Sequence, residues 1–234
     1  MNKYTKPNFE SSAVITIDTQ CDTLDGQPLE IPGTSDVLPN IKKILGAYRE
    51  KRMPIVHIVR IYKKDGSNVD LCRKEVVENG EEMLLEGSSG CELASEMFQA
   101  GNVNLDTDLL LSGKMQEISN HETIIYKPRW GAFYETPLES HLKRLRVDTL
   151  VYVGCNFPNC PRTSIYEASE RDFKIVLVED AISGLYSKGK EEMLNIGVLV
   201  VNAEAIENAI IATSHFGGRE EVRRPRGASF SARR

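Results

Sequence analysis

The chain of 234 residues lacks the features that mark secreted and membrane-spanning proteins. Its five cysteines are irregularly spaced and include no CxxC pair, which favours free thiols in a reducing compartment over a disulfide framework. No apolar run approaches the ~20 residues of a membrane span. The polar start, MNKYTKPNFESS, has no apolar signal core. We therefore expect a cytoplasmic protein that has no membrane partner.

Basic charge is also scarce in most of the chain. Asp and Glu (34) outnumber Lys and Arg (29), and the resulting net charge of −5 argues against a nucleic-acid partner. Residues 216–234 differ, because they are rich in glycine and arginine and poor in apolar residues. This composition predicts a mobile tail or an arm on a neighbouring subunit. No second hydrophobic core or linker precedes it, so residues 1–215 are expected to form a single domain.

Short apolar runs alternate with amphipathic stretches along residues 1–215. Continuous apolar runs suit parallel strands that are covered on both faces, and the intervening helices indicate right-handed crossovers. The pattern predicts a three-layer α-β-α domain around a mostly parallel, Rossmann-like sheet of about six strands. The expected strands are residues 13–18, 54–61, 123–126, 149–153, 173–178 and 198–201. The expected helices are residues 37–52, 71–79, 92–99, 137–145, 191–194, 203–212 and one that begins at Pro161.

The stretch VYVGCNFPNCPRTSIYEAS, residues 151–169, indicates a strand, a tight turn and a helix. Proline is favoured at the first helical position, so Pro161 would make Cys160 the residue that caps the helix. A thiol there meets unpaired backbone N–H groups and the positive end of the helix dipole, which both lower its pKa. Cys160 is therefore a candidate nucleophile. The alternative is a buried cysteine that acts as a small hydrophobic residue.

Two further polar residues follow predicted strands directly. Asp18 ends the strand AVITID, and Lys127 follows the strand TIIY. Because ligands bind outside the carboxyl ends of parallel strands, these two side chains and Cys160 would meet in one crevice if their strands adjoin. A thiol can then attack, a carboxylate can move protons, and an ammonium group can hold both anions. A turn or cap residue is the alternative for Asp18.

The long polar stretch of residues 62–90 is expected to shape the entrance for a substrate, although a plain surface insertion is nearly as consistent with its composition. His57 lies in the middle of a predicted strand, which favours a packed histidine over a ligand. Arg162 could hold a substrate carboxylate or pair with a nearby acid. Six residues are candidates for the pocket, each with core packing or a surface salt bridge as its alternative: Arg60, Tyr62, Trp130, Phe133, Phe157 and Arg162.

Three segments together resemble the isochorismatase-like cysteine hydrolases, which include nicotinamidases and N-carbamoylsarcosine amidase. They are AVITIDTQ, YKPRWGAFYETPLESHL and VGCNFPNCPRTSIYEASERDFKIVLVEDAISG. The resemblance covers roughly residues 13–212 and implies the isochorismatase-like hydrolase fold. It implies that Cys160 is the nucleophile, Asp18 the general acid and base, and Lys127 the third catalytic residue.

The resemblance also implies details of the nucleophile turn. A cis peptide bond that does not involve proline would lie between Cys155 and Asn156. The backbone N–H groups of Asn156 and Cys160 would form an oxyanion hole. Nicotinamidases carry an Asp-x-His metal site after the second strand, whereas this chain reads VRIYKKDGSN there, so we expect no such metal.

The implied activity is hydrolysis of a C–N bond in a small amide or ureido substrate through a thioester, without a cofactor. Relatives that cleave the vinyl ether of isochorismate lack the cysteine, so Cys160 favours amide cleavage. The resemblance further implies a homodimer or homotetramer. Two alternatives stay open: a non-catalytic member of the same fold, and a redox-sensing protein that uses Cys155 and Cys160.

Overall fold

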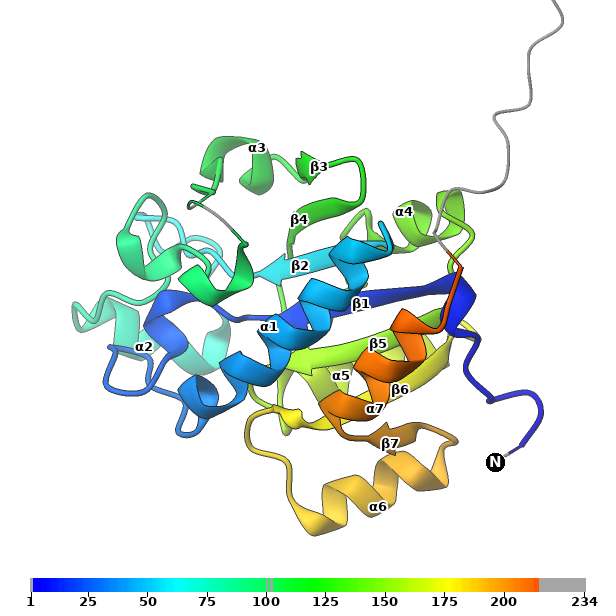
Figure 1. Ribbon diagram of the computed structural model, residues 1–234. Coiled ribbons are helices and arrows are strands. Elements are labelled where there is room, and N and C mark those ends of the chain that lie inside the picture. Colours follow the sequence, from blue (N-terminus) through cyan, green and yellow to red (C-terminus); the bar gives the residue numbers. More distant parts are fainter. Residues whose placement is uncertain (1, 100, 102, 215–234) are drawn as a thin grey trace, which may run out of the picture.

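The computed structural model describes residues 2–99, 101 and 103–214, in which a seven-stranded sheet lies between two layers of helices (Figure 1). The strand order is β3-β4-β2-β1-β5-β6-β7, and all neighbouring pairs are parallel except β3 and β4. The strands are β1 (Ser12–Ile17), β2 (Ile55–Val59), β3 (Gln116–Ser119), β4 (Glu122–Tyr126), β5 (Thr149–Gly154), β6 (Lys174–Ile182) and β7 (Leu199–Val201). The predicted three-layer α/β architecture is confirmed. The predicted tail, residues 216–234, lies outside the described residues.

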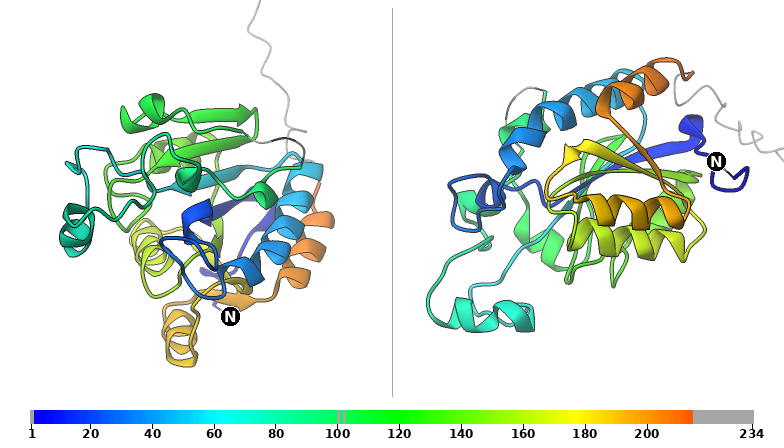
Figure 2. Two further views of the ribbon diagram at one scale, coloured as in Figure 1. Left: turned by 90° about the vertical axis from the view of Figure 1, so that its left-hand side faces the viewer. Right: turned by 90° about the horizontal axis from the view of Figure 1, so that it is seen from below.

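The two helical layers bury alternate residues of the same strands. In β1, Val14 packs into the core under α1 and α7, whereas Ile15 packs into the core on the opposite face. The right-hand view of Figure 2 shows α1 (blue) and α7 (orange) above the sheet and α5 (yellow-green) and α6 (gold) below it. Both faces of the central strands are therefore shielded from water, which explains why these strands are continuous apolar runs in the sequence. The helices are α1 (Thr34–Glu50), α2 (Leu71–Glu78), α3 (Thr107–Leu111), α4 (Leu138–Arg144), α5 (Cys160–Ser169), α6 (Ser187–Asn195) and α7 (Ala203–Ile211).

The sheet reverses its direction of winding between β1 and β5. β1 pairs with β2 on one side and with β5 on the other, so the chain builds outward in both directions from this point. Apart from the edge strand β3, the order is that of doubly wound nucleotide-binding sheets. In such sheets the crevice for a ligand opens at the carboxyl ends of the strands beside the reversal. Asp18 follows β1 directly, and the turn before Cys160 follows β5.

Two local differences from the sequence-based expectation have clear physical causes. β3 was not expected, because its four residues alternate between half-buried and exposed and carry a single large apolar residue. Helix α1 begins at Thr34, not after Asp36, because Gly33 adopts a left-handed conformation with φ 81°. The carboxylate of Asp25 accepts hydrogen bonds from the backbone N–H groups of Gly33 (2.9 Å) and Ser35 (2.8 Å), and so supports this earlier start.

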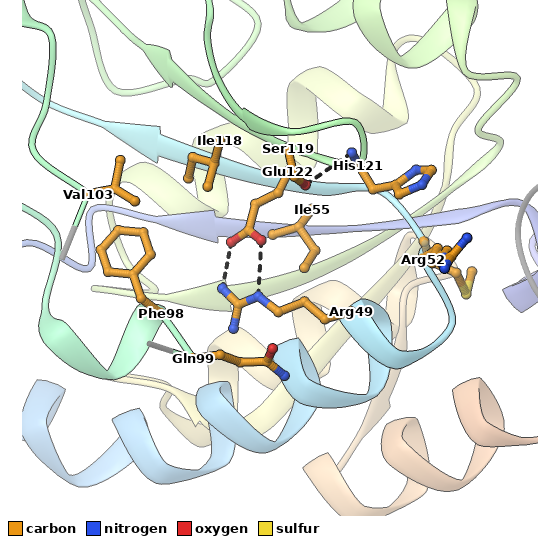
Figure 3. A pocket seen from close by; sticks show the side chains of 11 residues that line it. Arg49, Arg52, Ile55, Phe98, Gln99, Val103, Ile118, Ser119, His121 and Glu122 are labelled. Atoms are coloured by element: carbon orange, nitrogen blue, oxygen red, sulfur yellow. Dashed lines mark hydrogen bonds and ion pairs between the residues drawn. The ribbon is translucent and has the colours of Figure 1, made fainter. Parts of the chain in front are cut away.

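A chain of buried polar groups crosses the sheet below the crevice. His57 is fully buried, as expected for a packed histidine, and its Nδ1 lies 2.8 Å from Thr16 Oγ1. Its Nε2 lies 2.9 Å from Glu122 Oε1. Figure 3 shows Glu122 on β4 paired with Arg49 on α1 beside a pocket of about 390 Å³. Both ring nitrogens of His57 and both carboxylate oxygens of Glu122 therefore have a hydrogen-bond partner, as is usual for buried polar atoms.

The electrostatics of this network favour one protonation state. Burial lowers the pKa of His57, which keeps the ring neutral near pH 7 even though Glu122 opposes this effect. Burial alone raises the pKa of Glu122, but hydrogen bonds from His57 and Arg49 outweigh it and lower the pKa to about 2. Glu122 is therefore ionised and paired with Arg49. Both shifts favour the folded state at neutral pH over acidic pH.

We expect the fold to lose stability in two steps as the pH falls. His57 has a lowered pKa in the folded state, so its contribution is lost below about pH 6.5, the pKa of an unperturbed histidine. The contribution of Glu122 is present above about pH 4.5 and is lost as the pH falls towards about 2. Glu122→Gln should remove the second step and cost roughly 3 kcal/mol at pH 7, because Arg49 loses its buried partner. Urea unfolding between pH 7 and pH 3 measures both effects.

The matched control is Glu117→Gln, which changes an exposed glutamate on the neighbouring strand β3. This variant should follow the parent protein at every pH. If Glu122→Gln lost stability in parallel with the parent between pH 5 and pH 3, the acid sensitivity would have to come from other carboxylates.

Candidate active site

Three polar side chains from distant parts of the chain meet in the crevice at the winding reversal. Lys127 Nζ lies 3.0 Å from Asp18 Oδ2 and 3.2 Å from Cys160 Sγ. The same ammonium group donates to the backbone carbonyl of Arg129 at 3.3 Å. Lys127 is 1% exposed, Asp18 6% and Cys160 9%, so the cluster is almost completely screened from solvent. The strand-end positions therefore bring together the three residues that the sequence singled out.

Asp18 is held in an uncommon backbone conformation. Its φ of 50° lies in the left-handed region, which costs a residue other than glycine about 1 kcal/mol or more. Three hydrogen bonds fix it there. Its N–H donates to the carbonyl of Ile58 (2.9 Å), and its own carbonyl accepts from Thr23 Oγ1 (3.0 Å) and from Cys155 Sγ (3.0 Å). Contacts with β2, with Thr23 and with the turn after β5 thus fix the backbone of Asp18, and so define where its carboxylate lies.

Gly154 allows the turn after β5 to approach β1 closely. Its φ is +119°, and a Cβ atom added there would lie 2.2 Å from the carbonyl oxygen of Ile17. No other residue fits this position without displacing β1. The backbone N–H of Cys155 then donates to the same carbonyl at 2.9 Å. The nucleophile turn is in this way fixed directly to the strand that carries Asp18.

The expected cis peptide bond between Cys155 and Asn156 is not found: every peptide bond in the described residues is trans. The chain reverses instead through the unusual dihedral angles of Gly154 (φ +119°) and of Asn159 (φ −114°, ψ −106°). These angles reverse the chain while avoiding the cost of a cis bond that does not involve proline.

Helix α5 begins at Cys160 itself, with Asn159 as the N-cap, so the expected cap position was one residue too late. Ser164 Oγ donates to the carbonyl of Cys160 (2.7 Å) and accepts from the N–H of Ala132 (3.0 Å). This hydroxyl connects the helix to the loop that follows Lys127. Neither the N–H of Asn156 nor that of Cys160 donates to a backbone carbonyl of the described residues. Both N–H groups are therefore available to another acceptor.

The prediction that the helix terminus lowers the pKa of Cys160 is wrong. Burial and, after it, the charge of Asp18 together raise the pKa of this thiol to about 12, and Lys127 only partly opposes them. Burial also lowers the pKa of Lys127, but Asp18 and Cys160 outweigh that effect and raise it. At neutral pH the site therefore holds a protonated thiol beside an Asp18–Lys127 ion pair.

A small cavity of about 20 Å³ adjoins this cluster, which is room for about one water molecule. Its wall combines the turn after β5 with residues from two covering segments. The lining residues are Asp18, Thr23, Leu29, Ile31, Arg60, Arg73, Leu84, Cys155, Asn156, Asn159 and Cys160. Arg73 and Leu84 belong to the 62–90 segment, so this segment lies over the site, as an entrance-shaping loop would.

Three of the six candidate pocket residues lie at or beside this cavity. Arg60 lines it and is buried, with Nη2 3.2 Å from Asp70 Oδ2. Tyr62 donates its hydroxyl hydrogen to the same carboxylate oxygen at 2.8 Å and accepts from Arg73 Nη1 at 2.9 Å. Trp130 lies beside Arg73, whose guanidinium carbon is 5.6 Å from the ring centroid. Tyr62 and Trp130 thus contact Arg73, whereas Arg60 lies over the ring of Tyr62, with its guanidinium carbon 4.5 Å from the centroid.

The other three candidates do not line the cavity. Phe133 is buried against Phe173, with ring centroids 5.8 Å apart. Phe157 is fully buried beneath Tyr186. Arg162 pairs with Glu192 on α6 at 2.7 Å and stands outside the crevice. The two phenylalanines are core residues and Arg162 is part of a partly exposed ion pair, which corrects their assignment to the pocket.

Arg73 was missed by sequence reasoning. It lies on the short polar helix α2, which the sequence predicted, but only the path of the 62–90 segment brings it over Cys160. Gln20 was part of a quoted motif without an assigned role. Its side-chain amide donates to the carbonyl of Arg60 (2.8 Å) and accepts from the N–H of Arg60 (2.8 Å), and so fixes Arg60 beside the crevice.

The region after β2 does not suit a metal cation. The buried guanidinium of Arg60 occupies it and is paired with Asp70. Across residues 2–99, 101 and 103–214, no three His, Cys, Asp or Glu side chains gather closely enough to hold a metal ion. In the same part of the chain, no helix is both long and apolar enough to cross a bilayer.

The fold and the site together define a doubly wound α/β protein with a carboxylate, an ammonium group and a thiol at its winding reversal. Residues 12–204 match the Isochorismatase domain family, so the chain belongs to this family. The expected family membership is thereby confirmed.

Individual relatives are distant in sequence. A protein of Arabidopsis thaliana named a probable inactive nicotinamidase is 24% identical over 197 residues, which cover 81% of this chain and 91% of the relative. N-carbamoylsarcosine amidase of an Arthrobacter species is 26% identical over 171 residues, 73% of this chain and 58% of the amidase. The crystal structure of an isochorismatase family protein from Desulfovibrio vulgaris is similar with a TM-score of 0.72 at 26% identity, covering 86% of this chain and 98% of that one.

We expect Asp18→Asn to accelerate alkylation of Cys160 by iodoacetamide at pH 8, because loss of the neighbouring negative charge lowers the thiol pKa. Each unit of pKa is worth a tenfold change in the thiolate fraction. Lys127→Met should have the opposite effect. Peptide mass spectrometry measures the rate, with the exposed Cys72 of the same chain as the internal reference. Slower alkylation in Asp18→Asn would show that Asp18 does not suppress the thiolate.

Proposed function

We propose that the protein is a cysteine-dependent amidohydrolase that cleaves the C–N bond of a small amide or ureido compound. The observation that carries the proposal is the position of Lys127 Nζ, 3.0 Å from Asp18 Oδ2 and 3.2 Å from Cys160 Sγ. In this reading Cys160 is the nucleophile, Asp18 the general base and acid, and Lys127 the electrostatic support of both. The amidase among the relatives supports the same class of reaction.

The first step forms the nucleophile. Since Cys160 is protonated at rest, its proton needs an acceptor, and Asp18 Oδ1 is buried without a hydrogen-bond partner among the described residues. Asp18 takes the thiol proton while the sulfur attacks the carbonyl carbon of the substrate. Lys127 keeps its proton and stabilises the sulfur as the negative charge passes from Asp18 through it to the carbonyl oxygen of the substrate.

The second step stabilises the tetrahedral intermediate. The carbonyl oxygen becomes an oxyanion. The free N–H groups of Asn156 and Cys160 would donate hydrogen bonds to it. Loss of one such donor typically costs 10²–10³ in turnover. Because both donors belong to the backbone of one turn, Gly154 and Asn159 determine their direction.

The third step breaks the C–N bond. Asp18 returns its proton to the nitrogen, the amine or ammonia leaves, and the acyl group stays on sulfur as a thioester. Asp18 then accepts a proton from a water molecule whose oxygen attacks the thioester carbon. The C–S bond breaks, Asp18 gives this proton to the sulfur, and the acid product leaves. One water molecule is consumed in each cycle, and no electrons are exchanged with another reagent.

Cys155 has a structural role in this proposal. Its thiol donates to the carbonyl of Asp18, and burial raises its pKa, so it is a poor partner for thiol–disulfide exchange. Both Cys155 and Cys160 are free thiols. These observations weigh against a redox sensor that would use this pair.

We expect release of ammonia from at least one compound in a panel of nicotinamide, succinamic acid, N-carbamoylglycine and the methyl esters of the two acids. Cys160→Ala should lower the turnover by roughly 10³–10⁶, as loss of a nucleophile does elsewhere. Cys72→Ala removes an exposed thiol from α2 and should keep the turnover. Acid quenching during turnover should trap an acyl adduct on Cys160, which intact-protein mass spectrometry detects. Full turnover by Cys160→Ala, or a well-folded parent without activity on the panel, would contradict the proposal.

A further inference from the structure

Arg73 is a charged group of the cavity that the reaction above does not use. It lies on α2, in the segment that covers the site, and lines the same cavity as Asp18 and Cys160. Burial lowers the pKa of Arg73, but Tyr62 and then the charges of Cys160 and Asp18 outweigh burial and raise it. The guanidinium is therefore within electrostatic range of the reacting atoms. Its orientation is also defined, because Nη1 donates to Tyr62 Oη at 2.9 Å.

The charges around the cavity leave a positive excess at Arg73. Lys127 is neutralised by Asp18 at 3.0 Å, and Arg60 by Asp70 at 3.2 Å. Arg73 has no carboxylate within ion-pair distance among the residues that the structure describes. A partly buried guanidinium without a counter-ion is costly, and a bound anion would offset this cost.

A second group in the same wall also lacks an acceptor. Arg60 Nε is buried and has no hydrogen-bond partner in the described part of the chain, although the other nitrogens of this guanidinium are bonded. Buried polar atoms of native proteins are rarely left without a partner. Two arginines of one cavity thus have unused capacity for an acceptor. A guanidinium binds a carboxylate through two parallel hydrogen bonds, which makes a carboxylate the best match.

We propose, on the basis of the proposed amidohydrolase function, that the substrate carries a carboxylate and that Arg73 binds it. The substrate class is then a small amide or ureido acid, with its carboxylate under α2 and its amide carbon at Cys160 Sγ. Tyr62 accepts a hydrogen bond from the guanidinium and the Trp130 ring lies beside it, and these two contacts orient it. The role first considered for Arg162, binding a substrate carboxylate, passes to Arg73.

The closed cavity fits this assignment. A volume of about 20 Å³ admits about one water molecule, so a substrate enters only when the covering segment moves outward. Figure 2 shows α2 extending beyond the three layers of the domain. The segment packs through its own small cluster, formed by Tyr62, Val69, Met83 and Leu84. Because Arg73 is on this segment, its bond to the substrate carboxylate would form as the segment closes over the site.

The test compares two pairs of probes, N-carbamoylglycine with its methyl ester and succinamic acid with its methyl ester; in each pair the ester lacks the negative charge and carries one additional methyl group. The parent should prefer each acid over its ester by at least tenfold in kcat/KM. Arg73→Gln should abolish this preference, mainly by raising KM for the acids, and should change the kinetics of the esters little. Arg73→Lys should keep part of the preference. Lys74→Gln, which removes an exposed positive charge from the same helix, should keep all of it.

Three outcomes would overturn the assignment: an unchanged acid preference in Arg73→Gln, an equal loss for acid and ester, or a parent that prefers the esters. Urea unfolding confirms that each variant is folded. If Arg73→Gln does not fold, the acid preference of Arg73→Lys decides the test. Calorimetric binding to Cys160→Ala separates this proposal from the hydrolase proposal. Tighter binding of the acids that depends on Arg73 supports a carboxylate site even if no probe is hydrolysed, and equal or absent binding of acid and ester refutes it.

Discussion

The ammonium group of Lys127 is the constraint around which the site is built. An isolated ammonium with 1% exposure would cost several kcal/mol, and Asp18 makes it tolerable at 3.0 Å. The two residues follow β1 and β4, which lie on opposite sides of β2, so this pair requires the three strands to be in register. The thiol of Cys160 is added from β5 on the other side of β1. The proposed reaction and the stability of the fold therefore depend on the same buried charges, and removing either member of the pair leaves the other uncompensated.

Most of the fold could be predicted from the sequence because helices cover the sheet on both faces. Alternate residues such as Val14 and Ile15 enter two different cores, so a strand becomes a continuous apolar run that differs plainly from an amphipathic helix. The same reasoning explains why the sequence did not predict β3 or the start of α1. β3 is an antiparallel edge strand with one half-buried face, and its four residues carry almost no apolar signal. The start of α1 depends on Asp25, which approaches it only in the folded chain.

The site was predictable where a topological rule applies and unpredictable where tertiary packing decides. The carboxyl ends of neighbouring parallel strands lie at one edge of a sheet, and this rule predicts that Asp18, Lys127 and Cys160 meet if their strands adjoin. The position of Arg73 depends on the path of a long segment, for which no comparable rule exists. The direction of the pKa shift at Cys160 also needed the structure. A helix terminus contributes about 0.3–1 kcal/mol, less than one pKa unit, whereas full burial shifts a pKa by up to 3–5 units.

The small cluster beneath α2 has a consequence for how such proteins diversify. Tyr62, Val69, Met83 and Leu84 pack mainly with one another and with Leu29 and Val77, apart from the two large cores that hold the sheet. Substitutions at exposed positions of this segment therefore leave the packing of the sheet unchanged, while they alter the groups at the entrance to the crevice. A chimera that exchanges only this segment between two distant homologues would keep Asp18, Lys127 and Cys160 and replace the residues that cover them.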